Sequence, residues 1–291
     1  MLRGTGVALV TPFRADGAVD FPALERLLVH THAAGKGVDY WVVMGTTGEA
    51  ATLSAEEKQL VLDFVCGHNP AQKPVVYGIG GNNTQEVLDT LKKTNLEGVT
   101  AILSVSPYYN KPPQAGIIKH FTVLADASLL PIVLYNVPGR TASNMKAETT
   151  LSLAEHKNII GVKEASGDLV QCVEIAQHAP PHFQLISGDD LLTVPMIAIG
   201  AKGVISVLAN ALPVDFSEMT RQALQGNFVG ATALLHGFLP INPLMYEESN
   251  PVGVKQILEF LGVCTNEVRL PLIAASENLK NRLSKLLPTK I

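Results

Sequence analysis

The sequence predicts a (β/α)₈ TIM barrel followed by a C-terminal helical region, and three observations lead to this α/β fold class. Short apolar runs rich in β-branched residues recur as far as about residue 210 in a chain of 291 residues, and segments with helical spacing separate them. Each run is nearly continuous, which is typical of strands covered on both faces. Strands that alternate with helices form parallel βαβ units, and eight such units have the length of a closed barrel. We assign residues 1–227 to the barrel and residues 228–291 to the helical region, with a doubly wound open sheet as the alternative.

The predicted strands follow one another at intervals that leave room for one helix between consecutive strands. They span residues 6–12, 40–45, 74–80, 99–107, 131–138, 159–166, 183–190 and 202–210. In the C-terminal region, helices are predicted over residues 254–261 and 272–286.

Helix signals lie between the strands. Residues 21–34 place three leucines on one face, as expected of an amphipathic helix. Ser54 is followed three residues later by Glu57, which is the pattern of a capping box. Thr84 is a candidate N-cap, with Glu86 in the first turn of the helix that follows.

Composition excludes several classes of protein. The net charge of −4 argues against a nucleic-acid-binding surface, which needs a basic excess. No apolar run reaches the roughly 18 residues that a membrane-spanning helix requires. The three cysteines are far apart and form no CxxC pair, which indicates reduced thiols rather than a disulfide framework. We therefore expect a cytoplasmic protein with no nucleic-acid or membrane partner.

Polar residues of chemical interest follow the predicted strands. In (β/α)₈ barrels the chemistry takes place at the C-terminal ends of the strands and in the loops after them. The sequence places an amine, phenols, hydroxyls and a guanidinium there, all able to converge on one cavity. These residues are Thr46, Thr47, Tyr108, Tyr109, Tyr135, Arg140 and Lys163.

Lys163 stands where an apolar strand should continue, in the stretch GVKEASGD. Burying an ammonium without a partner is costly, so a dry strand environment favours the neutral and nucleophilic amine. Such an amine can condense with a ketone to form a Schiff base, and a phenol such as Tyr135 can transfer the protons. The alternative is a structural lysine that pairs with Glu164 or Asp168.

Five motifs, in their order and spacing, resemble those of the dihydrodipicolinate synthase family. They are GTTGEAATL, SPYYNKPPQ, YNVPGR, GVKEASGD and SGDD, and the resemblance covers essentially the whole chain. The family belongs to the pyruvate-dependent class I aldolases, which also include N-acetylneuraminate lyase. The resemblance implies a (β/α)₈ barrel, a homotetramer, a lyase of lysine biosynthesis through diaminopimelate, and no cofactor or metal.

The resemblance also implies catalytic roles. Lys163 matches the lysine that forms the Schiff base with pyruvate, and Tyr135 matches the tyrosine that relays protons. Thr46 matches the threonine that links this tyrosine to a second one. Tyr109 matches that second tyrosine, which in the family reaches the site from a neighbouring subunit.

Four further residues match substrate-binding positions of the family. Thr47 matches the position that binds the pyruvate carboxylate, and Arg140 matches the arginine that binds the carboxylate of L-aspartate 4-semialdehyde. A guanidinium suits this role because it offers a bidentate fork to a carboxylate. Ile205 matches a residue whose backbone carbonyl lies near the Schiff base, and Gly188 matches a glycine that leaves room beside it.

The choice of substrate depends on two features. Arg140 suits an acceptor whose carboxylate lies close to its aldehyde, and related enzymes that act on sugar acids generally lack this arginine. The paired threonines of GTTGE also resemble the synthase more than the sialic-acid lyase. We therefore expect condensation of pyruvate with L-aspartate 4-semialdehyde. The alternative is another pyruvate-dependent aldolase that acts on N-acetylneuraminate or 2-keto-3-deoxy sugar acids.

Two readings of a different class remain. His30 and His32 could hold a divalent metal in a barrel hydrolase, but residues two apart on a helix point in different directions. The other is a barrel that binds a ligand but catalyses no reaction. The complete set of residues that match the family's catalytic positions argues against it.

Part of the family's L-lysine inhibition site is also matched. Asn82, Glu86 and Tyr108 match its polar positions, whereas Ala50 and Lys58 stand where inhibited members carry serine and histidine. A cation at Lys58 would repel the ammonium of L-lysine. We therefore expect weak or absent feedback inhibition.

Overall fold

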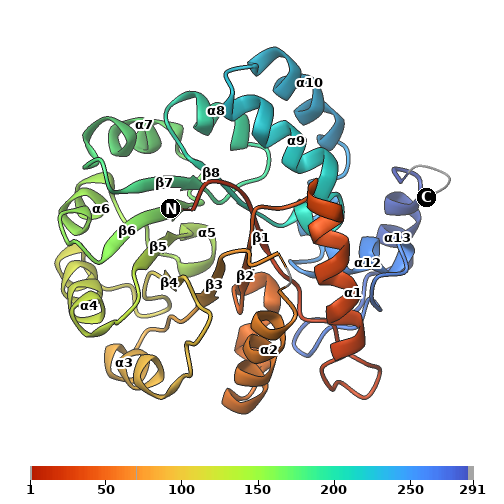
Figure 1. Ribbon diagram of the computed structural model, residues 1–291, viewed down its shortest axis with the longest axis horizontal. Coiled ribbons are helices and arrows are strands. Elements are labelled where there is room, and N and C mark those ends of the chain that lie inside the picture. The colour runs from red at the N-terminus through yellow and green to blue at the C-terminus, as the bar shows by residue number, and fades with distance from the viewer. Residues whose placement is uncertain (1, 70, 288–291) are drawn as a thin grey trace.

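Eight parallel strands close into a barrel in the computed structural model, which describes residues 2–69 and 71–287 (Figure 1). Each strand pairs with the next along the chain, and β8 pairs with β1 to complete the ring. The strands are β1 (Gly4–Ala8), β2 (Tyr40–Val43), β3 (Val75–Gly78), β4 (Ala101–Val105), β5 (Ile132–Asn136), β6 (Ile159–Glu164), β7 (Gln184–Ser187) and β8 (Gly203–Ser206). The predicted fold class is confirmed, and the open-sheet alternative is wrong.

The strands end earlier than the apolar runs predict. The run over residues 202–210, for example, leaves the sheet at Ser206, and Leu208–Asn210 form the short 3₁₀ helix η4. Leu208 is nevertheless fully buried. Apolar residues continue past the strand ends because the mouth of the barrel is itself packed, so hydrophobicity alone does not mark where pairing stops.

The ring closes where two glycines face each other. Gly4 of β1 is paired with Gly203 of β8, and both have positive φ angles, of 89° and 151°. A Cβ atom at Gly203 would lie 1.9 Å from the carbonyl oxygen of Gly4. Only glycine allows the two strands to approach this closely.

Helices form an outer ring around the strands (Figure 1). They are α1 (Phe21–His32), α2 (Ala55–Gly67), α3 (Thr84–Lys93), α4 (Gln114–Ala127), α6 (Ala147–Ala154), α7 (Leu169–His178), α8 (Thr193–Ala198) and α9 (Pro213–Leu224). The short helix α5 (Pro138–Thr141) follows β5 and lies inside this ring (Figure 1). Three short 3₁₀ helices lie near β2: η1 (Ala33–Gly35), η2 (Thr46–Gly48) and η3 (Ala50–Thr52). Within the described ranges, no helix is long and apolar enough to cross a membrane.

The predicted helix starts are right in one case and wrong in the other. Ser54 and Glu57 form the predicted capping box at the start of α2. At α3, however, the N-cap is Asn83, whose side chain accepts a hydrogen bond from the first turn. Thr84 is the first residue of the helix, and its Oγ1 lies 2.8 Å from Nδ1 of His120. The hydroxyl therefore joins α3 to α4 instead of capping its own helix.

The C-terminal region is helical, as predicted, but its last helix is shorter than expected. It contains α10 (Phe228–Phe238), α11 (Leu244–Glu247), α12 (Val252–Phe260) and α13 (Glu277–Ser284). Residues 272–275 lie outside α13 because Ser276 caps its start. Figure 1 places α12 and α13 beside α1, and the Arg26 side chain of α1 donates a hydrogen bond to the Val263 carbonyl just after α12. The domain boundary after residue 227 stays a prediction.

Strand side chains divide between two apolar cores. Leu134 and Val162 pack in the outer core, between the sheet and the helices. Tyr135, Ile186 and Ile205 pack in the inner core, inside the barrel. Because successive residues of a strand point to opposite faces, the register of the strands decides which polar groups reach the interior.

Candidate active site

Lys163 lies inside the barrel near the end of β6. In the strand register it stands between Tyr135 of β5 and Ile186 of β7, both of which belong to the inner core. The lysine is only 5% exposed, and its Nζ lies 4.5 Å from the centroid of the Tyr135 ring. The amine and the phenol predicted to act together are therefore adjacent.

The structural alternative for Lys163 is not observed. None of the ion pairs within residues 2–69 and 71–287 includes its Nζ. Glu164, on the outer face of β6, accepts hydrogen bonds from Asn136 and Gln171, and burial raises the pKa of its carboxyl group. Asp168 caps the start of α7. Both carboxyl groups thus serve the helix layer, and neither pairs with the interior amine.

The Lys163 cavity, as we call the hollow beside this amine, has a volume of about 740 Å³. Six residues predicted from the sequence line it, namely Thr46, Thr47, Tyr135, Arg140, Lys163 and Gly188. A Cβ atom at Gly188 would lie 3.1 Å from Cε of Lys163, so the glycine does leave room beside the lysine. Ile205 is fully buried in the inner core and does not line the cavity.

Tyr109 is the predicted residue that the chain does not bring to this site. It is 86% exposed, has a φ of 73°, and lines neither of the cavities described here. A bulky residue with positive φ is strained, and such strain persists only where the surroundings hold it. The single chain therefore presents this tyrosine outward, on the loop after β4.

The Glu86 cavity, a second hollow of about 550 Å³, adjoins the first. Five residues matched to the family's inhibition site line it: Ala50, Lys58, Asn82, Glu86 and Tyr108. Thr46, Tyr135 and Arg140 line both cavities. A cation that enters the Glu86 cavity would lie close to these shared residues and hence to the Lys163 cavity. Burial lowers the pKa of Lys58, which also lines the Glu86 cavity.

A buried ion pair missed by the sequence analysis holds the loop that carries Thr46 and Thr47. Nζ of Lys255, on α12, lies 2.6 Å from Oε1 of Glu49, and both side chains are almost fully buried. The backbone N–H of Arg269 donates to Oε2 of the same carboxylate. Burial lowers the pKa of Lys255, and the Glu49 carboxylate opposes that shift. Hydrogen bonds from the C-terminal region thus hold Glu49, the residue that follows GTTG.

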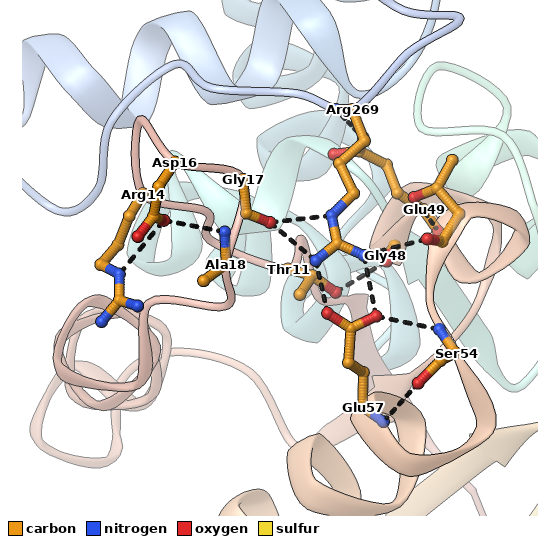
Figure 2. Close-up of polar contacts among 11 residues, drawn as sticks. Thr11, Arg14, Asp16, Gly17, Ala18, Gly48, Glu49, Ser54, Glu57 and Arg269 are labelled. Carbon is orange, nitrogen blue, oxygen red and sulfur yellow. Dashed lines mark hydrogen bonds and ion pairs between the residues drawn. The ribbon is translucent and has the colours of Figure 1, made fainter.

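Arg269 extends this contact to the N-terminal part of the chain (Figure 2). Its guanidinium donates to the carbonyls of Gly17 and Thr52 and to both carboxylate oxygens of Glu57. These hydrogen bonds hold the pKa of Glu57 down, to about 2. Figure 2 also shows Glu57 completing the capping box with Ser54. One arginine therefore joins three segments that are far apart in the sequence.

Two further contacts complete the mouth. Asn250, just before α12, donates from Nδ2 to the Thr47 hydroxyl over 3.0 Å. Asp190, at the end of β7, accepts the backbone N–H groups of Val207 and Leu208, and desolvation raises its pKa to about 6. A lysine inside the mainly apolar run VGVKQIL was the sequence signal for the buried pair, because a buried lysine requires a partner.

Of the two histidines considered as metal ligands, His30 has another contact. Nε2 of His30 lies 3.0 Å from the Ala211 carbonyl, and burial lowers its pKa. His32 is two residues further along, at the end of α1. In the described part of the chain, no group of three or more metal-ligating side chains is present.

Comparison with known proteins decides the family. Residues 1–290 match the model of the dihydrodipicolinate synthetase family. The chain belongs to this family. It is 51% identical to the 4-hydroxy-tetrahydrodipicolinate synthase of Cytophaga hutchinsonii, over 97% of this chain and 94% of that protein.

Solved structures agree with this family assignment. The dihydrodipicolinate synthase of Acinetobacter baumannii, solved in complex with pyruvate, matches with a TM-score of 0.94 and 36% identity over 98% of both chains. The synthase of Aquifex aeolicus matches with a TM-score of 0.92 and 37% identity, over 98% of this chain and 97% of that one. The predicted family and the enzyme class, a lyase of the class I aldolase type, are thus confirmed.

The buried pair leads to a prediction about stability. Replacing Lys255 by methionine removes the cation and leaves the Glu49 carboxylate buried without it, which should lower the free energy of unfolding by about 3–5 kcal/mol. The double variant Glu49→Gln with Lys255→Met removes both charges and should recover much of this loss. Urea denaturation followed by circular dichroism measures both effects.

The exposed pair of Lys280 with Glu277 provides the matched control, because a Lys280→Met change should leave unfolding nearly unaltered. A Lys255→Met variant as stable as the wild type would show that the pair of Lys255 with Glu49 does not stabilise the fold.

Proposed function

We propose that this protein condenses pyruvate with L-aspartate 4-semialdehyde through a Schiff base on Lys163, the reaction of the 4-hydroxy-tetrahydrodipicolinate synthases to which it is related. The observation that carries the proposal is the buried Lys163 amine, which lies beside the Tyr135 phenol in a cavity that Arg140 also lines. The product belongs to the diaminopimelate route to lysine.

The environment of Lys163 supports its role as nucleophile. Its Nζ lies inside the barrel beside the Tyr135 ring and forms no ion pair among the described residues, so a carbonyl that enters the cavity can meet this nitrogen. Addition of Nζ to C2 of pyruvate and loss of water give an iminium ion. This ion withdraws electrons from C3, so that a proton leaves C3 and the resulting enamine can attack the aldehyde carbon of the second substrate. No cofactor is needed because the iminium is the electron sink.

The neighbours of Lys163 have roles that their positions support. Tyr135, next to the amine, would move the protons of imine formation. Thr46 would connect this phenol to Tyr109, and Thr47 would hold the pyruvate carboxylate, with its hydroxyl fixed by Asn250. The backbone carbonyl of Ile205 would lie near the Schiff base.

Arg140 supports the choice of the second substrate. It lies on α5 at the mouth, is exposed, and lines both cavities. A guanidinium at the opening can bind the carboxylate of an incoming aldehyde acid in a bidentate manner. The alternative, cleavage of N-acetylneuraminate or of 2-keto-3-deoxy sugar acids, would require hydroxyl-binding groups instead of this cation.

The exposure of Tyr109 supports a homotetramer in which this residue enters the site of a neighbouring subunit. An aromatic side chain that is 86% exposed on a strained loop gains little in a monomer. Tyrosine is enriched at protein interfaces because it combines a large apolar ring with a hydroxyl.

The Schiff base is tested by reduction. Incubation with pyruvate and borohydride should add the mass of one reduced pyruvate adduct, and peptide mapping should place it on Lys163. Replacing Arg140 by alanine should leave this adduct intact but lower kcat/KM for the semialdehyde about 100-fold or more, because a carboxylate loses its charged partner. No adduct, or an adduct on another residue, would overturn the proposal, and turnover of sugar acids alone would favour the alternative aldolase.

The subunit contribution is tested by mixing inactive variants. Tyr109→Phe and Lys163→Ala should each lower activity by about 100-fold or more, because each removes one group of the proton and Schiff-base chemistry. Co-expression should form mixed oligomers in which some sites combine an intact lysine with an intact tyrosine, so part of the activity returns. Activity no higher than in either variant alone would show that Tyr109 does not act across an interface.

Feedback inhibition is tested with L-lysine. Submillimolar L-lysine should lower the activity less than about 2-fold, because Lys58 repels the ammonium of the inhibitor in a confined cavity. A Lys58→Gln variant should be inhibited more strongly, whereas Lys92→Gln, an exposed change on α3, should behave as the wild type. Strong inhibition of the wild type would contradict the prediction.

A further inference from the structure

β6 contains one extra residue ahead of the lysine in the cavity. Ile132 of β5 is paired with Ile159 of β6, whereas Val133 is paired with Gly161. Ile160 is therefore an extra residue in β6, and the register shifts there. Such a β-bulge re-aims the side chains that follow it, and bulges are frequent beside active sites. The bulge in β6 thus bears on which residues reach the barrel interior.

The bulge turns Lys163 into the barrel. Ile159 packs in the outer core and Ile160 packs against the inner core, as alternation along a strand requires. Val162 packs in the outer core, although unbroken alternation from Ile160 would place it in the inner one. The reversal of faces therefore lies between these two residues. Without it Lys163 would point to the helices, because a shift of one residue moves every side chain to the other face.

Buried hydrogen bonds hold the outer face of the sheet just beyond the bulge. Asn136 and Glu164, the last residues of β5 and β6, are paired with each other and are almost fully buried. Nδ2 of Asn136 lies 3.1 and 3.0 Å from the two carboxylate oxygens of Glu164. Oε2 also accepts from Nε2 of Gln171 over 3.0 Å, and Oε1 accepts the backbone N–H of Ser166 over 2.8 Å. These contacts with Glu164 all come from N–H groups.

The same amides reach the segment after α5. Oδ1 of Asn136 accepts the backbone N–H of Met145 over 2.9 Å, and Nδ2 of Asn144 donates to Oε1 of Gln171 over 2.9 Å. Gln171 belongs to α7. One set of hydrogen bonds therefore joins the ends of β5 and β6, the segment after α5 and the start of α7. We call it the Glu164 network, and its side chains are Asn136, Asn144, Glu164 and Gln171.

The Glu164 network favours one of two registers of β6. In a register without the bulge, Glu164 would face the apolar interior and Lys163 would face the amides. A carboxyl group that loses its N–H partners and enters an apolar core is strongly disfavoured. The close approach of β6 to β7 in the bulged register is allowed by Gly161, where a Cβ atom would lie 2.5 Å from the Gln184 carbonyl oxygen. The local sequence therefore supplies both the extra residue and the contacts that favour the bulged register.

We propose that the Glu164 network selects the bulged register of β6, in which Lys163 faces the cavity, and that Glu164 is a positioning residue for this lysine. The inference rests on the proposed function and deepens it, since it states what keeps the nucleophile beside Tyr135. The carboxyl group of Glu164 acts through the strand to which it belongs and does not meet the substrate.

The experiment measures how fast pyruvate labels Lys163. Samples taken at intervals after mixing with saturating pyruvate are quenched with borohydride, and mass spectrometry counts the adduct per folded molecule. Glu164→Leu should slow labelling about 10-fold or more, because hydrogen bonds to a charged acceptor contribute a factor of this order to the choice of register. Glu164→Gln, which keeps an acceptor oxygen, should slow it less than about 3-fold. Circular dichroism gives the folded fraction of each variant.

Thr31→Val is the matched control for a general loss of stability. It removes the hydrogen bond that Nε1 of Trp41 donates to the Thr31 hydroxyl over 3.1 Å, between two fully buried side chains of α1 and β2. Because this contact lies outside β5 and β6, its loss should slow labelling of folded molecules less than about 2-fold. Slowing as large as that in Glu164→Leu would show that any loosened barrel loses the reaction, and would overturn the inference.

Hydrogen exchange measures the register without pyruvate. The backbone N–H of Ala165 donates to the Asn136 carbonyl, and that of Gly188 donates to the Glu164 carbonyl. These two amides should exchange about 10-fold faster or more in Glu164→Leu, because both hydrogen bonds depend on the register at the end of β6. The control variant should leave their exchange unchanged. Mass spectrometry of peptides that contain the two amides measures this.

Each contrary result has a distinct meaning. Labelling of Glu164→Leu at the wild-type rate, or slower labelling without faster exchange, overturns the inference while the proposed function stands. An equal loss in Glu164→Gln would assign the effect to the charge and also overturn it. Should Glu164→Leu not fold, Gln171→Leu takes its place and should slow labelling about 3-fold or more, since it removes one donor to the carboxylate; a wild-type rate there overturns the inference.

Failure of the proposed function would be seen separately. If the wild-type protein forms no adduct on Lys163, the Schiff base is excluded, and hydrogen exchange alone decides the register. Exchange in Glu164→Leu that equals the wild type would then overturn the role of the Glu164 network as well.

Discussion

The place of the Lys163 amine inside the barrel, where no ion pair of the described residues engages it, is the constraint on which the site depends. Carboxylates are close in sequence, yet the alternation of β6 turns Glu164 to the outer face, where Asn136 and Gln171 hold it. The amine is left beside an aromatic ring and inside an apolar core. Had Glu164 pointed to the interior, it could have formed an ion pair with this amine and occupied it. Strand alternation therefore decides which groups the amine meets as well as how the strand packs.

The barrel supplies the reacting groups, but the C-terminal region positions them. Glu49 follows the turn that carries Thr46 and Thr47, and it is held by Lys255 and by the backbone of Arg269. Loss of one partner of such a pair is costly, but replacement of both partners by apolar residues often is not, so the pair can serve position more than stability. The Glu49 carboxylate accepts hydrogen bonds from Lys255 and from the backbone of Arg269 at once. Two contacts fix both the position and the direction of the Glu49 side chain. The segment after residue 228 thus acts as part of the site.

The sequence predicted the fold class, all eight strands and six of the residues that line the Lys163 cavity, because these depend on local pattern and on the order of motifs. It failed where tertiary contacts override local preference. Thr84 has the chemistry of an N-cap, but His120 engages its hydroxyl and Asn83 takes the cap. The pair of Glu49 with Lys255 joins positions 206 residues apart, and no periodicity connects them.

The two cavities share part of their lining, so a ligand in one would act on the chemistry proposed for the other. Thr46, Tyr135 and Arg140 line both the Lys163 cavity and the Glu86 cavity, so a molecule bound in the second hollow touches groups assigned to proton transfer and to carboxylate binding. No long-range conformational change is required for such coupling, because an added charge or a displaced side chain acts within one layer of residues. The same closeness has a reciprocal effect: a carboxylate bound at Arg140 must alter the affinity of the Glu86 cavity for a cation. Lys58 already places a basic group in that cavity, and a variant that removes it should strengthen both effects together.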